Sequence, residues 1–491
     1  MSLPHYDHFI NGAYAPPARG DYFDTDNPYT GQAWARIARG DAQDVNAAVL
    51  AAKTAFEGPW GGLTATRRGQ LLRRLADLII EQAPRLAEVE QRDNGKLSSE
   101  VVAQVRYMGD YFHYYAGLAD KVESKVIPTD KQGVFTYTRY EAKGVVAIIT
   151  PWNSPLTLTS WKLAPALAAG CTAVIKPSEF TSASMLEFAA LFEKAGFPPG
   201  VVNVVTGFGP EVGEPLVAHP DVAHVGFTGG ELAGKRIYEA AARHLKTVTL
   251  ELGGKSPNII FDDADLDQAV KGVVSGVFAA SGQSCQAGSR VLVQENIHDE
   301  LVRRLVDFVS QAKLGDPTLP DTQIGPIATR PQFEKILDYI QIARDEGARC
   351  VMGGKARGDL GAGQFVEPTI FTGVNNRMRI AQEEVFGPVV CIIPFKDEDD
   401  AIRIGNDILY GLAGAVWTRS LHRAMYVTER LKAGTVWVNN YRATSFTTPF
   451  GGYKRSGIGR ESGSDAIHEY LNTKSVWIST DLDVPNPFIR R

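Results

Sequence analysis

The sequence has few cysteines and no long apolar run, and these two shortages exclude several classes of protein. Its four cysteines are scattered and form no Cys-x-x-Cys pair: Cys171, Cys285, Cys350 and Cys391. A disulfide framework or a zinc site is therefore not expected, and no metal is predicted. The best apolar stretch, residues 144–150, has only the length of a strand, so no membrane-spanning helix is predicted.

Clusters of basic residues are also missing, and acidic residues outnumber basic ones by 56 to 51, which gives a formal net charge of −5. Because nucleic-acid binding depends on Lys and Arg side chains that contact phosphates, we expect no nucleic-acid partner. The first residues, MSLPHYDHFINGAY, show no basic segment followed by an apolar one. A signal peptide is therefore not predicted, and the cytoplasm is the expected location.

The 491 residues are too many for one ordinary core, so two or three domains are expected. From residue 143 on, apolar segments of strand length alternate with segments of helical periodicity. The first half has predicted strands at 143–150, 171–178, 200–207 and 222–230, and predicted helices at 157–170, 182–196 and 231–245. This alternation predicts a doubly wound, parallel α/β sheet with a nucleotide site. A helix at 264–281, a strand at 289–294 and a helix at 298–315 predict a second α/β domain.

The N-terminal part contains a hairpin signal and three helical patterns. Asn11-Gly12 lies between apolar residues, as in a two-residue hairpin loop. Helices are predicted at 44–56, with Asp41 or Asp44 as the N-cap, at 67–89 and at 108–119. Residues 122–142 show an extended, alternating pattern. The tail from 475 to 491 is short and partly extended, and it either packs on a partner subunit or stays free.

Three residues in separate windows have side chains suited to acyl chemistry. Cys285, in SGQSCQAGSR, lies among small residues that let a carbonyl substrate and backbone N–H groups approach its sulfur. Glu251 ends the apolar run VTLELGG, where burial would raise its pKa toward the range of a general base. Asn153 follows a buried strand, where its amide could stabilise an oxyanion. Taken alone, each residue is also explained by ordinary turn or strand-end chemistry.

Charged and glycine-rich segments after other strands suggest a dinucleotide site. Lys176 and Glu179 in VIKPSE could contact ribose and phosphate, although a solvated ion pair explains them equally well. The glycines from Gly207 to Gly213 miss the strict GxGxxG spacing by one residue. The segment from Gly226 to Gly230 opens a helix, and the first N–H groups of a helix suit a pyrophosphate.

Seven motifs in this order resemble the aldehyde dehydrogenase superfamily: PWN, IKPSE, GFTG, ELGGKSP, GQSC, EEVFGPV and PFGGYKRSGIGRE. The resemblance extends from FINGAY to the last strand near Val476. It implies an α/β fold with a Rossmann-type NAD-binding domain (1–121 and 143–252), an α/β catalytic domain (253–455) and a small β bridging or oligomerisation element (122–142 and 470–491). It also implies a homodimer or a homotetramer.

The resemblance implies roles for individual residues as well. Cys285 matches the nucleophile, Glu251 the base that activates the hydrolytic water, and Asn153, with the backbone N–H of Cys285, the oxyanion hole. The matching cofactor contacts are Ile149, Thr150, Trp152, Lys176, Glu179, Gly209, Gly213, Thr228, Gly229, Gly230, Glu384 and Phe386. The substrate tunnel would involve Ser154, Leu158, Trp161, Ser284, Gln286 and Arg442, within or near the loop 441–446. A lowered pKa of the Cys285 thiol, aided by bound cofactor, is expected.

The implied reaction is the oxidation of an aldehyde to a carboxylic acid by NAD, through a thiohemiacetal and a thioester on Cys285. Glu179 favours NAD over NADP, because its carboxylate would repel a 2′-phosphate. Gly230 stands where many relatives have Ser, which removes one hydroxyl contact to phosphate, and Ser154 stands where several have an aromatic residue. Arg442 is a candidate anchor for a substrate carboxylate, although a surface or interface Arg is the simpler interpretation.

The mixed polar and aromatic tunnel predicts a polar, aromatic or semialdehyde substrate. Two alternatives remain: a semialdehyde dehydrogenase that uses NADP, and a catalytically silent structural paralogue. Relatives that transfer the acyl group to CoA typically lack the acid at Glu251, so this residue disfavours a CoA-acylating enzyme.

Overall fold

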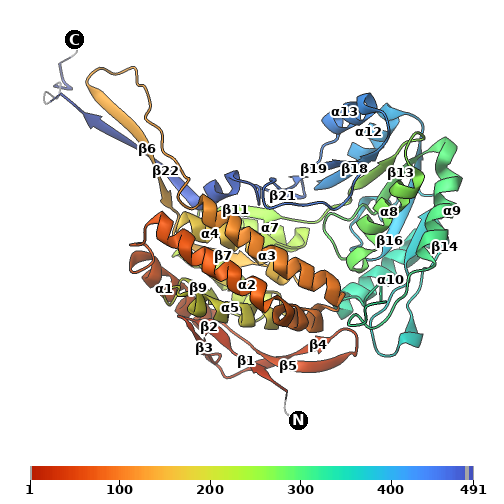
Figure 1. Cartoon of the computed structure of the whole chain (residues 1–491), viewed down its shortest axis with the longest axis horizontal. Helices are drawn as coiled ribbons and strands as arrows, with labels where there is room; N and C mark the ends of the chain where they lie inside the picture. The colour runs from red at the N-terminus through yellow and green to blue at the C-terminus, as the bar shows by residue number, and fades with distance from the viewer. Residues whose placement is uncertain (1–2, 482–485, 490–491) are drawn as a thin grey trace.

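The computed structural model describes residues 3–481 and 486–489, which form two helix-covered sheets and a projecting arm (Figure 1). The first sheet has eight strands, in the order β21 (Gly457–Ile458), β11 (Thr247–Glu251), β10 (Val222–Thr228), β7 (Val145–Ile149), β8 (Thr172–Lys176), β9 (Val202–Val204), β2 (His8–Ile10) and β3 (Ala13–Ala15). The five strands from β11 to β9 are parallel, as the strand–helix alternation predicts. β7 and β8 are buried along their whole length, which explains their unbroken apolar sequences.

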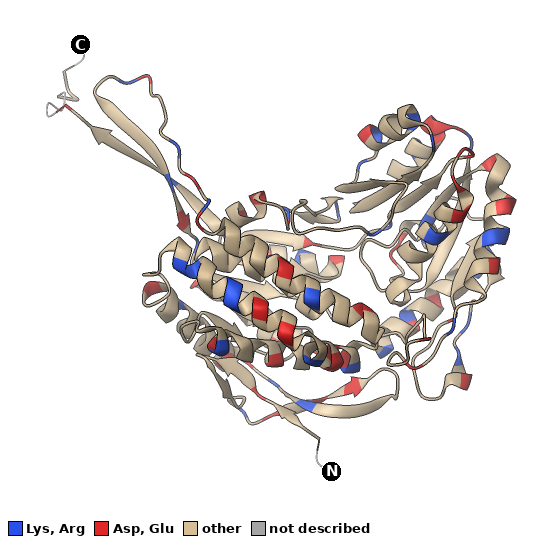
Figure 2. Ribbon diagram, in the orientation of Figure 1, with Lys and Arg blue, Asp and Glu red and all other residues tan. Residues whose placement is uncertain are grey.

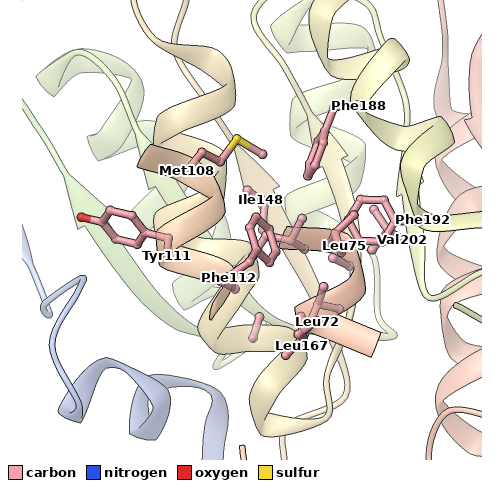
Figure 3. Close-up of a cluster of buried hydrophobic side chains, with 14 of the residues drawn as sticks. Leu72, Leu75, Met108, Tyr111, Phe112, Ile148, Leu167, Phe188, Phe192 and Val202 are labelled. Carbon is pink, nitrogen blue, oxygen red and sulfur yellow. The ribbon is translucent and has the colours of Figure 1, made fainter. Parts of the chain in front are cut away.

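Helices cover both faces of this sheet: α1 (Ala42–Glu57), α2 (Ala65–Asn94), α3 (Ser98–Leu118), α4 (Pro155–Ala169), α5 (Ala183–Ala195), α6 (Glu214–Ala218) and α7 (Glu231–Ala242). Asp41 caps α1 in a capping box with Asp44, and α4 ends at Gly170 in the left-handed conformation. Figure 3 shows the core in which α2, α3, α4 and α5 meet the sheet, with Leu72, Phe112 and Ile148 in its middle.

Some predicted helix boundaries are wrong. The helix predicted at 298–315 ends at Val309, and the largest difference is at the start of α3. The sequence predicts a helix that begins at residue 108, whereas α3 begins at Ser98. The first turns of α3 lack a continuous apolar pattern, but they bury Val101 and Val105 in the core that α3 shares with α2. Tertiary packing therefore extends this helix beyond what the local sequence indicates.

The second sheet has seven strands, in the order β14 (Arg349–Met352), β15 (Thr369–Thr372), β16 (Val389–Phe395), β13 (Arg290–Gln294), β12 (Pro257–Ile260), β18 (Ala413–Trp417) and β19 (Thr435–Val438). All neighbouring pairs are parallel except β14 and β15. Its covering helices are α8 (Leu266–Val277), α9 (His298–Val309), α10 (Arg330–Asp345), α12 (Glu398–Asn406) and α13 (Leu421–Arg430). The second α/β unit expected from the sequence is thus present.

The helix predicted at 264–281 is shorter in the structure. α8 ends at Val277, and a single 3-10 turn follows at Ala279–Gly282. Inside this turn Ala280 and Ser281 have φ of 51° and 53°, which a helix cannot accommodate. The turn redirects the chain just before Cys285.

The arm consists of β6 (Val134–Ala142) and β22 (Leu471–Ser479), which pair antiparallel along their whole length and extend away from both sheets (Figure 1). Of the predicted element at 470–491, residues 482–485 and 490–491 lie outside the described residues. After the second sheet the chain returns to the first, where β21 pairs antiparallel with β11.

Small elements complete the fold: β1 (His5–Tyr6), β5 (Gln32–Ala38) and β4 (Tyr22–Asn27) form a three-stranded sheet, and β17 (Tyr410–Gly411) pairs with β20 (Tyr453–Lys454). The short α11 spans Arg379–Gln382.

Figure 2 shows acidic and basic residues intermixed on the helices that face the viewer. On α9, for example, Arg303 and Arg304 both pair with Glu300. Among the described residues, no helix is both long and apolar enough to cross a membrane.

Candidate functional site

Two adjoining cavities lie where the parallel strands β7, β8 and β10 end. The larger has a volume of about 850 Å³, and the smaller, of about 140 Å³, reaches Cys285. They share the side chain of Trp152 and the turn from Thr228 to Gly230 in their walls. All twelve predicted cofactor residues line one or both: Ile149, Thr150, Trp152, Lys176, Glu179, Gly209, Gly213, Thr228, Gly229, Gly230, Glu384 and Phe386.

Lys176 and Glu179 form an ion pair at one wall of the larger cavity. The Lys176 ammonium lies 3.2 Å from a carboxylate oxygen of Glu179. Burial lowers the pKa of Lys176, and the charge of Glu179 opposes this effect. The Glu179 side chain is partly exposed, so the pair presents a carboxylate toward any ligand in this cavity.

The glycine spacing that departs from GxGxxG has a structural cause. Gly209–Gly213 forms one π-helical turn, which leads directly into α6. A π turn contains one residue more than an α turn, which accounts for the extra residue between these glycines. The turn still brings Gly209 and Gly213 to the wall of the larger cavity.

The two glycines at the start of α7 differ in the space that a side chain would have. A Cβ on Gly229 would lie 2.5 Å from the Phe227 ring, so any other residue would force this ring to move. Gly230 is the N-cap of α7, has ordinary extended backbone angles and has open space where a side chain would project. The fold therefore has room at position 230 for the serine side chain that many relatives have there.

Cys285 is the cysteine that lines the smaller cavity. Cys171 and Cys391 are buried in the cores, and Cys350 lies on β14 with its sulfur near the Met352 carbonyl. Burial and the negative charges of Glu251 and Glu384 raise the pKa of the Cys285 thiol to about 12. The charged side chains that raise the pKa of this thiol are acidic. The lowered pKa expected with bound cofactor stays a prediction.

Asn153 forms a hydrogen bond between the loop after β7 and the segment that carries Cys285. It follows β7, and its side-chain amide donates a 2.9 Å hydrogen bond to the backbone carbonyl of Gln283, two residues before Cys285. The side chain is 8% exposed and lies in the wall of the smaller cavity. An amide fixed beside the sulfur is suited to stabilise negative charge on a substrate oxygen.

Glu251, the last residue of β11, also lines the smaller cavity. Both its carboxylate oxygens are buried, and neither has a hydrogen-bond partner among the described residues. Burial raises its pKa well above the ordinary value, and the charge of Glu461 adds to this shift, while Lys162 and Arg460 oppose it. A carboxylate with a raised pKa and free lone pairs can accept a proton near neutral pH.

The sequence interpretation missed Lys162 and Glu461, which interact directly behind Glu251. The Lys162 ammonium lies 2.5 Å from a carboxylate oxygen of Glu461, and it also donates to the hydroxyl of Thr228. Both side chains are almost fully buried. A lysine within the otherwise uncharged, buried helix α4 was the available signal, and Glu461 lies in the motif PFGGYKRSGIGRE, to which no role was attached.

Gln332 and Lys335 of α10 also line the smaller cavity and were missed. They belong to an amphipathic surface helix, where polar residues are the default, so the sequence carried no signal for them. Opposite them, Glu384 accepts a hydrogen bond of 3.1 Å from the backbone N–H of Gly254. Phe386 packs edge-on against Trp152, with ring centroids 5.3 Å apart.

The predicted tunnel residues lie in three different surroundings. Leu158 lines the smaller cavity, and Ser284 and Gln286 flank Cys285. Trp161 stacks on Tyr111 with ring centroids 5.8 Å apart, and Ser154 accepts a hydrogen bond from Lys96.

Arg442, the predicted anchor, is half-buried and donates to the Ser275 carbonyl at 3.3 Å. It is absent from the wall of the cavity at Cys285. An anchoring role for Arg442 stays a prediction.

Residues 14–476 match the sequence model of the aldehyde dehydrogenase family. The chain belongs to this family. A (Z)-2-((N-methylformamido)methylene)-5-hydroxybutyrolactone dehydrogenase from Acinetobacter baylyi is 47% identical and covers 98% of this chain and 99% of its own.

Solved aldehyde dehydrogenases have the same fold. Betaine aldehyde dehydrogenase from Staphylococcus aureus, in complex with NAD+, has a TM-score of 0.97 at 42% identity, over 99% of this chain and 97% of its own. An aldehyde dehydrogenase from Bacillus cereus, also an NAD+ complex, has a TM-score of 0.95 at 44% identity, over 97% and 96%. The fold expected from the aldehyde dehydrogenase motifs is therefore confirmed. Within the described residues, no group of three or more His, Cys, Asp or Glu could hold a metal ion.

Proposed function

We propose that this aldehyde dehydrogenase oxidises an aldehyde to a carboxylic acid with NAD, through a thioester on Cys285 that water hydrolyses. One observation carries the proposal: Cys285, Asn153 and Glu251 line a single small cavity that adjoins one of about 850 Å³. A nucleophile, an amide donor and a base are the three groups that acyl chemistry requires.

Each of the three residues has one task. The Cys285 sulfur, as thiolate, forms a bond to the aldehyde carbon, and the Asn153 amide and the backbone N–H of Cys285 stabilise the resulting oxyanion. Bound NAD supplies the hydride acceptor for this reaction. Glu251 then removes a proton from the water that attacks the thioester carbon, and the acid leaves as Cys285 is released.

Several features support NAD as the cofactor. The larger cavity has the lining residues that the resemblance assigns to a dinucleotide, and both solved relatives are NAD+ complexes. The carboxylate of Glu179 would repel the 2′-phosphate of NADP, so we propose a preference for NAD. A positive charge beside Cys285 would also lower the raised pKa of its thiol, and a nicotinamide cation has this charge.

We further propose the three-part division expected from the sequence: NAD-binding (1–121 and 143–252), catalytic (253–455) and oligomerisation (122–142 and 470–491). A two-stranded arm has no core of its own, and Phe135, Trp477 and Ile478 on it are at least two-fifths exposed. Burial of these side chains against a second copy of the chain would give a homodimer or homotetramer.

We propose a polar, aromatic or semialdehyde substrate. Two of the three relatives named above are named for a hydroxybutyrolactone derivative and for betaine aldehyde, which are both polar molecules. Aromatic rings of Tyr111, Trp161 and Phe450 pack next to one another on the side of Cys285.

The test is NADH formation by purified protein given NAD and short aliphatic, aromatic, carboxylated and aminated aldehydes. Activity is expected on at least one class, and Cys285→Ala is expected to abolish it, whereas the matched variant Cys350→Ala retains it. Unchanged activity in Cys285→Ala would overturn the mechanism. If CoA stimulates NADH formation, transfer of the acyl group to CoA is favoured over hydrolysis. If the protein binds NAD but forms no NADH with any aldehyde, the catalytically silent paralogue is favoured.

A further inference from the structure

Three consecutive residues shortly before Cys285 have left-handed backbone angles. Ala280, Ser281 and Gly282 have φ of 51°, 53° and 72°. Glycine adopts this conformation readily, but alanine and serine are strained in it. A strained turn of this kind persists only where the surrounding structure holds it. Contacts from other parts of the chain must therefore keep this turn in place.

Two side chains of the turn region are attached to the segment before α10. The Ser281 hydroxyl donates to the Gly325 carbonyl at 2.8 Å. The side-chain oxygen of Gln283 accepts from the Ala328 N–H at 2.9 Å. These hydrogen bonds hold the turn itself, but they do not account for the place at which α8 ends.

At the end of α8, hydrogen-bond partners are exchanged. In a continuing α-helix the N–H of residue 280 would donate to the carbonyl of residue 276. In the structure the Gly276 carbonyl accepts instead from the N–H of Gly288, at 3.2 Å. The Ala280 N–H donates at 3.3 Å to a carboxylate oxygen of Glu100, which lies in the first turn of α3. The Glu100 carboxylate thus replaces the helix's own carbonyl as the acceptor.

The hydrogen bond between Gly288 and Gly276 closes a loop that carries Cys285. The Tyr441 ring packs against both ends of this loop, because a Cβ would lie 2.9 Å from it at Gly276 and 2.6 Å from it at Gly288. The Tyr441 hydroxyl also donates to the Gln286 carbonyl at 2.9 Å. The position of Cys285 therefore depends on a Gly276 carbonyl that is free to accept from Gly288.

The carboxylate of Glu100 is costly where it lies. Its second oxygen is buried and has no hydrogen-bond partner within the described residues. A buried carboxylate costs free energy unless it is paired. Its charge acts on Lys96, since burial lowers the pKa of this lysine while the charges of Glu90 and Glu100 oppose the shift. An apolar side chain would avoid this cost, but it could not accept the Ala280 N–H.

The same stretch of chain, from the end of α2 to the first turn of α3, also contacts the loop of Asn153. The Lys96 ammonium donates to the hydroxyl of Ser154, the residue after Asn153. It also donates to the side-chain oxygen of Gln104 at 2.9 Å. Glu100 and Lys96 thus hold, from one side, the turn before the nucleophile and the loop of the oxyanion donor.

We propose that Glu100 is a positioning residue for Cys285. It ends α8 by accepting the Ala280 N–H, which leaves the Gly276 carbonyl free to close the loop. The inference rests on the proposed function, in which the Cys285 sulfur attacks the aldehyde and Asn153 stabilises the oxyanion. Without the carboxylate, the Ala280 N–H returns to Gly276 and α8 extends into the loop. The sulfur then moves away from its place beside the Asn153 amide, and a misplacement of about 1 Å slows a reaction about a hundredfold.

The test compares Glu100→Ala, which removes the acceptor, with Glu100→Gln, which keeps an acceptor oxygen and loses the charge. Asp299→Ala is the matched control, because this acid also lies in the first turn of a helix, α9, and its side chain is fully exposed. Thermal unfolding checks that each variant is folded. Acyl formation is followed as the first burst of NADH in stopped-flow absorbance, with saturating NAD and aldehyde.

In Glu100→Ala we expect acyl formation to slow about tenfold or more at saturating aldehyde. The KM for NAD should stay within about twofold of wild type, because Glu100 lies outside the walls of both cavities. Glu100→Gln should stay within about threefold of wild type, because its side-chain oxygen still accepts, and Asp299→Ala should match wild type.

Two kinetic results would overturn the proposal. One is a burst rate within about twofold of wild type in folded Glu100→Ala. The other is an equal loss in Glu100→Gln, because a carboxylate that serves only the dipole of α3 needs its charge and not its acceptor oxygen.

A second readout does not depend on catalysis. The amide of Gly288 should exchange with deuterium about tenfold faster in Glu100→Ala than in wild type, because Ala280 takes its acceptor. In Glu100→Gln it should exchange at the wild-type rate. Mass spectrometry of the peptide 283–290 measures this exchange, and an unchanged rate in Glu100→Ala overturns the proposal. A wild-type protein that forms no acyl group overturns the proposed function, and the exchange of the Gly288 amide then decides on Glu100.

Discussion

Burial raises the pKa of Glu251 and the charge of the buried Glu461 carboxylate adds to this shift, although Glu251 ends β11 and Glu461 lies beyond β21. Lys162 is paired with Glu461 at 2.5 Å and lowers the pKa of both acids. The proton affinity of the proposed base is thus raised by burial and by Glu461, and lowered by the positive charges of Lys162 and Arg460.

Glu461→Gln should move the acidic limb of the pH–rate profile for acyl hydrolysis to lower pH. Only deprotonated Glu251 acts as a base, so the rate rises as pH passes through its pKa. Loss of the negative neighbour lowers that pKa, and the glutamine oxygen can still accept from Lys162. The profile is measured on the decay of the acyl group in single turnovers. A limb that stays in place or moves to higher pH would contradict the coupling.

Glu251→Gln should leave the first NADH burst intact and slow the steady state by about a hundredfold or more, because only hydrolysis requires the base. Stopped-flow absorbance resolves the two phases, and a stoichiometric acyl group on Cys285 should be found after the burst. A normal steady-state rate would show that another group activates the water.

Alkylation of Cys285 by iodoacetamide without NAD should speed up about tenfold per pH unit from about pH 7 to about pH 10, with no plateau. The thiol pKa of about 12 leaves only a small thiolate fraction over this range, and that fraction grows with pH. Peptide mass spectrometry separates Cys285 from Cys350. With NAD added, the alkylation rate should level off within this pH range, because the thiol pKa is lower. If the rate already levels off without NAD, the thiol pKa is much lower than about 12.

Glu179→Gln should raise kcat/KM for NADP about tenfold and change that for NAD much less. The substitution removes the charge that would repel a 2′-phosphate and keeps a polar side chain beside Lys176. Steady-state kinetics with both cofactors measure the ratio. An unchanged ratio would mean that Glu179 does not face the ribose.

Gly230→Ser should raise the free energy of unfolding by about 0.5–1 kcal/mol, since it adds an N-cap hydroxyl to α7 and restricts the unfolded chain. Gly229→Ser is the matched comparison and should destabilise, because its Cβ would meet the Phe227 ring at 2.5 Å. Chemical denaturation measures both. If Gly230→Ser is also destabilising, the space at the α7 terminus is not available.

The sequence predicted those parts of the fold that local patterns determine. The apolar run of β7 and the glycine that ends α4 gave the alternation of strands and helices, and Asn153 and Glu251 were found because they follow such runs. Local patterns already indicated Cys285, Lys176, Glu179 and the glycine turns, whereas the roles of Glu384 and Phe386 came from the family motifs alone.

The parts that the sequence did not predict depend on tertiary contacts. The left-handed turn at Ala280 and Ser281 replaces the end of a predicted helix, and neither position is a glycine, which would have signalled the change. Lys162 and Glu461 are distant in the chain, so their pairing is visible only in the folded protein. The raised pKa of the Cys285 thiol without cofactor also comes from the folded protein, because burial, Glu251 and then Glu384 act on it, and these residues are distant in the chain.

The arm formed by β6 and β22 has a consequence for how the chain exchanges its amide hydrogens. Among the described residues, its backbone is protected by nine cross-strand pairs and by a short bridge between Val126 and Tyr137. A two-stranded ribbon of this kind opens at little cost in water. Amides of the arm should therefore exchange with deuterium rapidly at low protein concentration, and any slowing on concentration would report directly on how much of the ribbon a second chain covers.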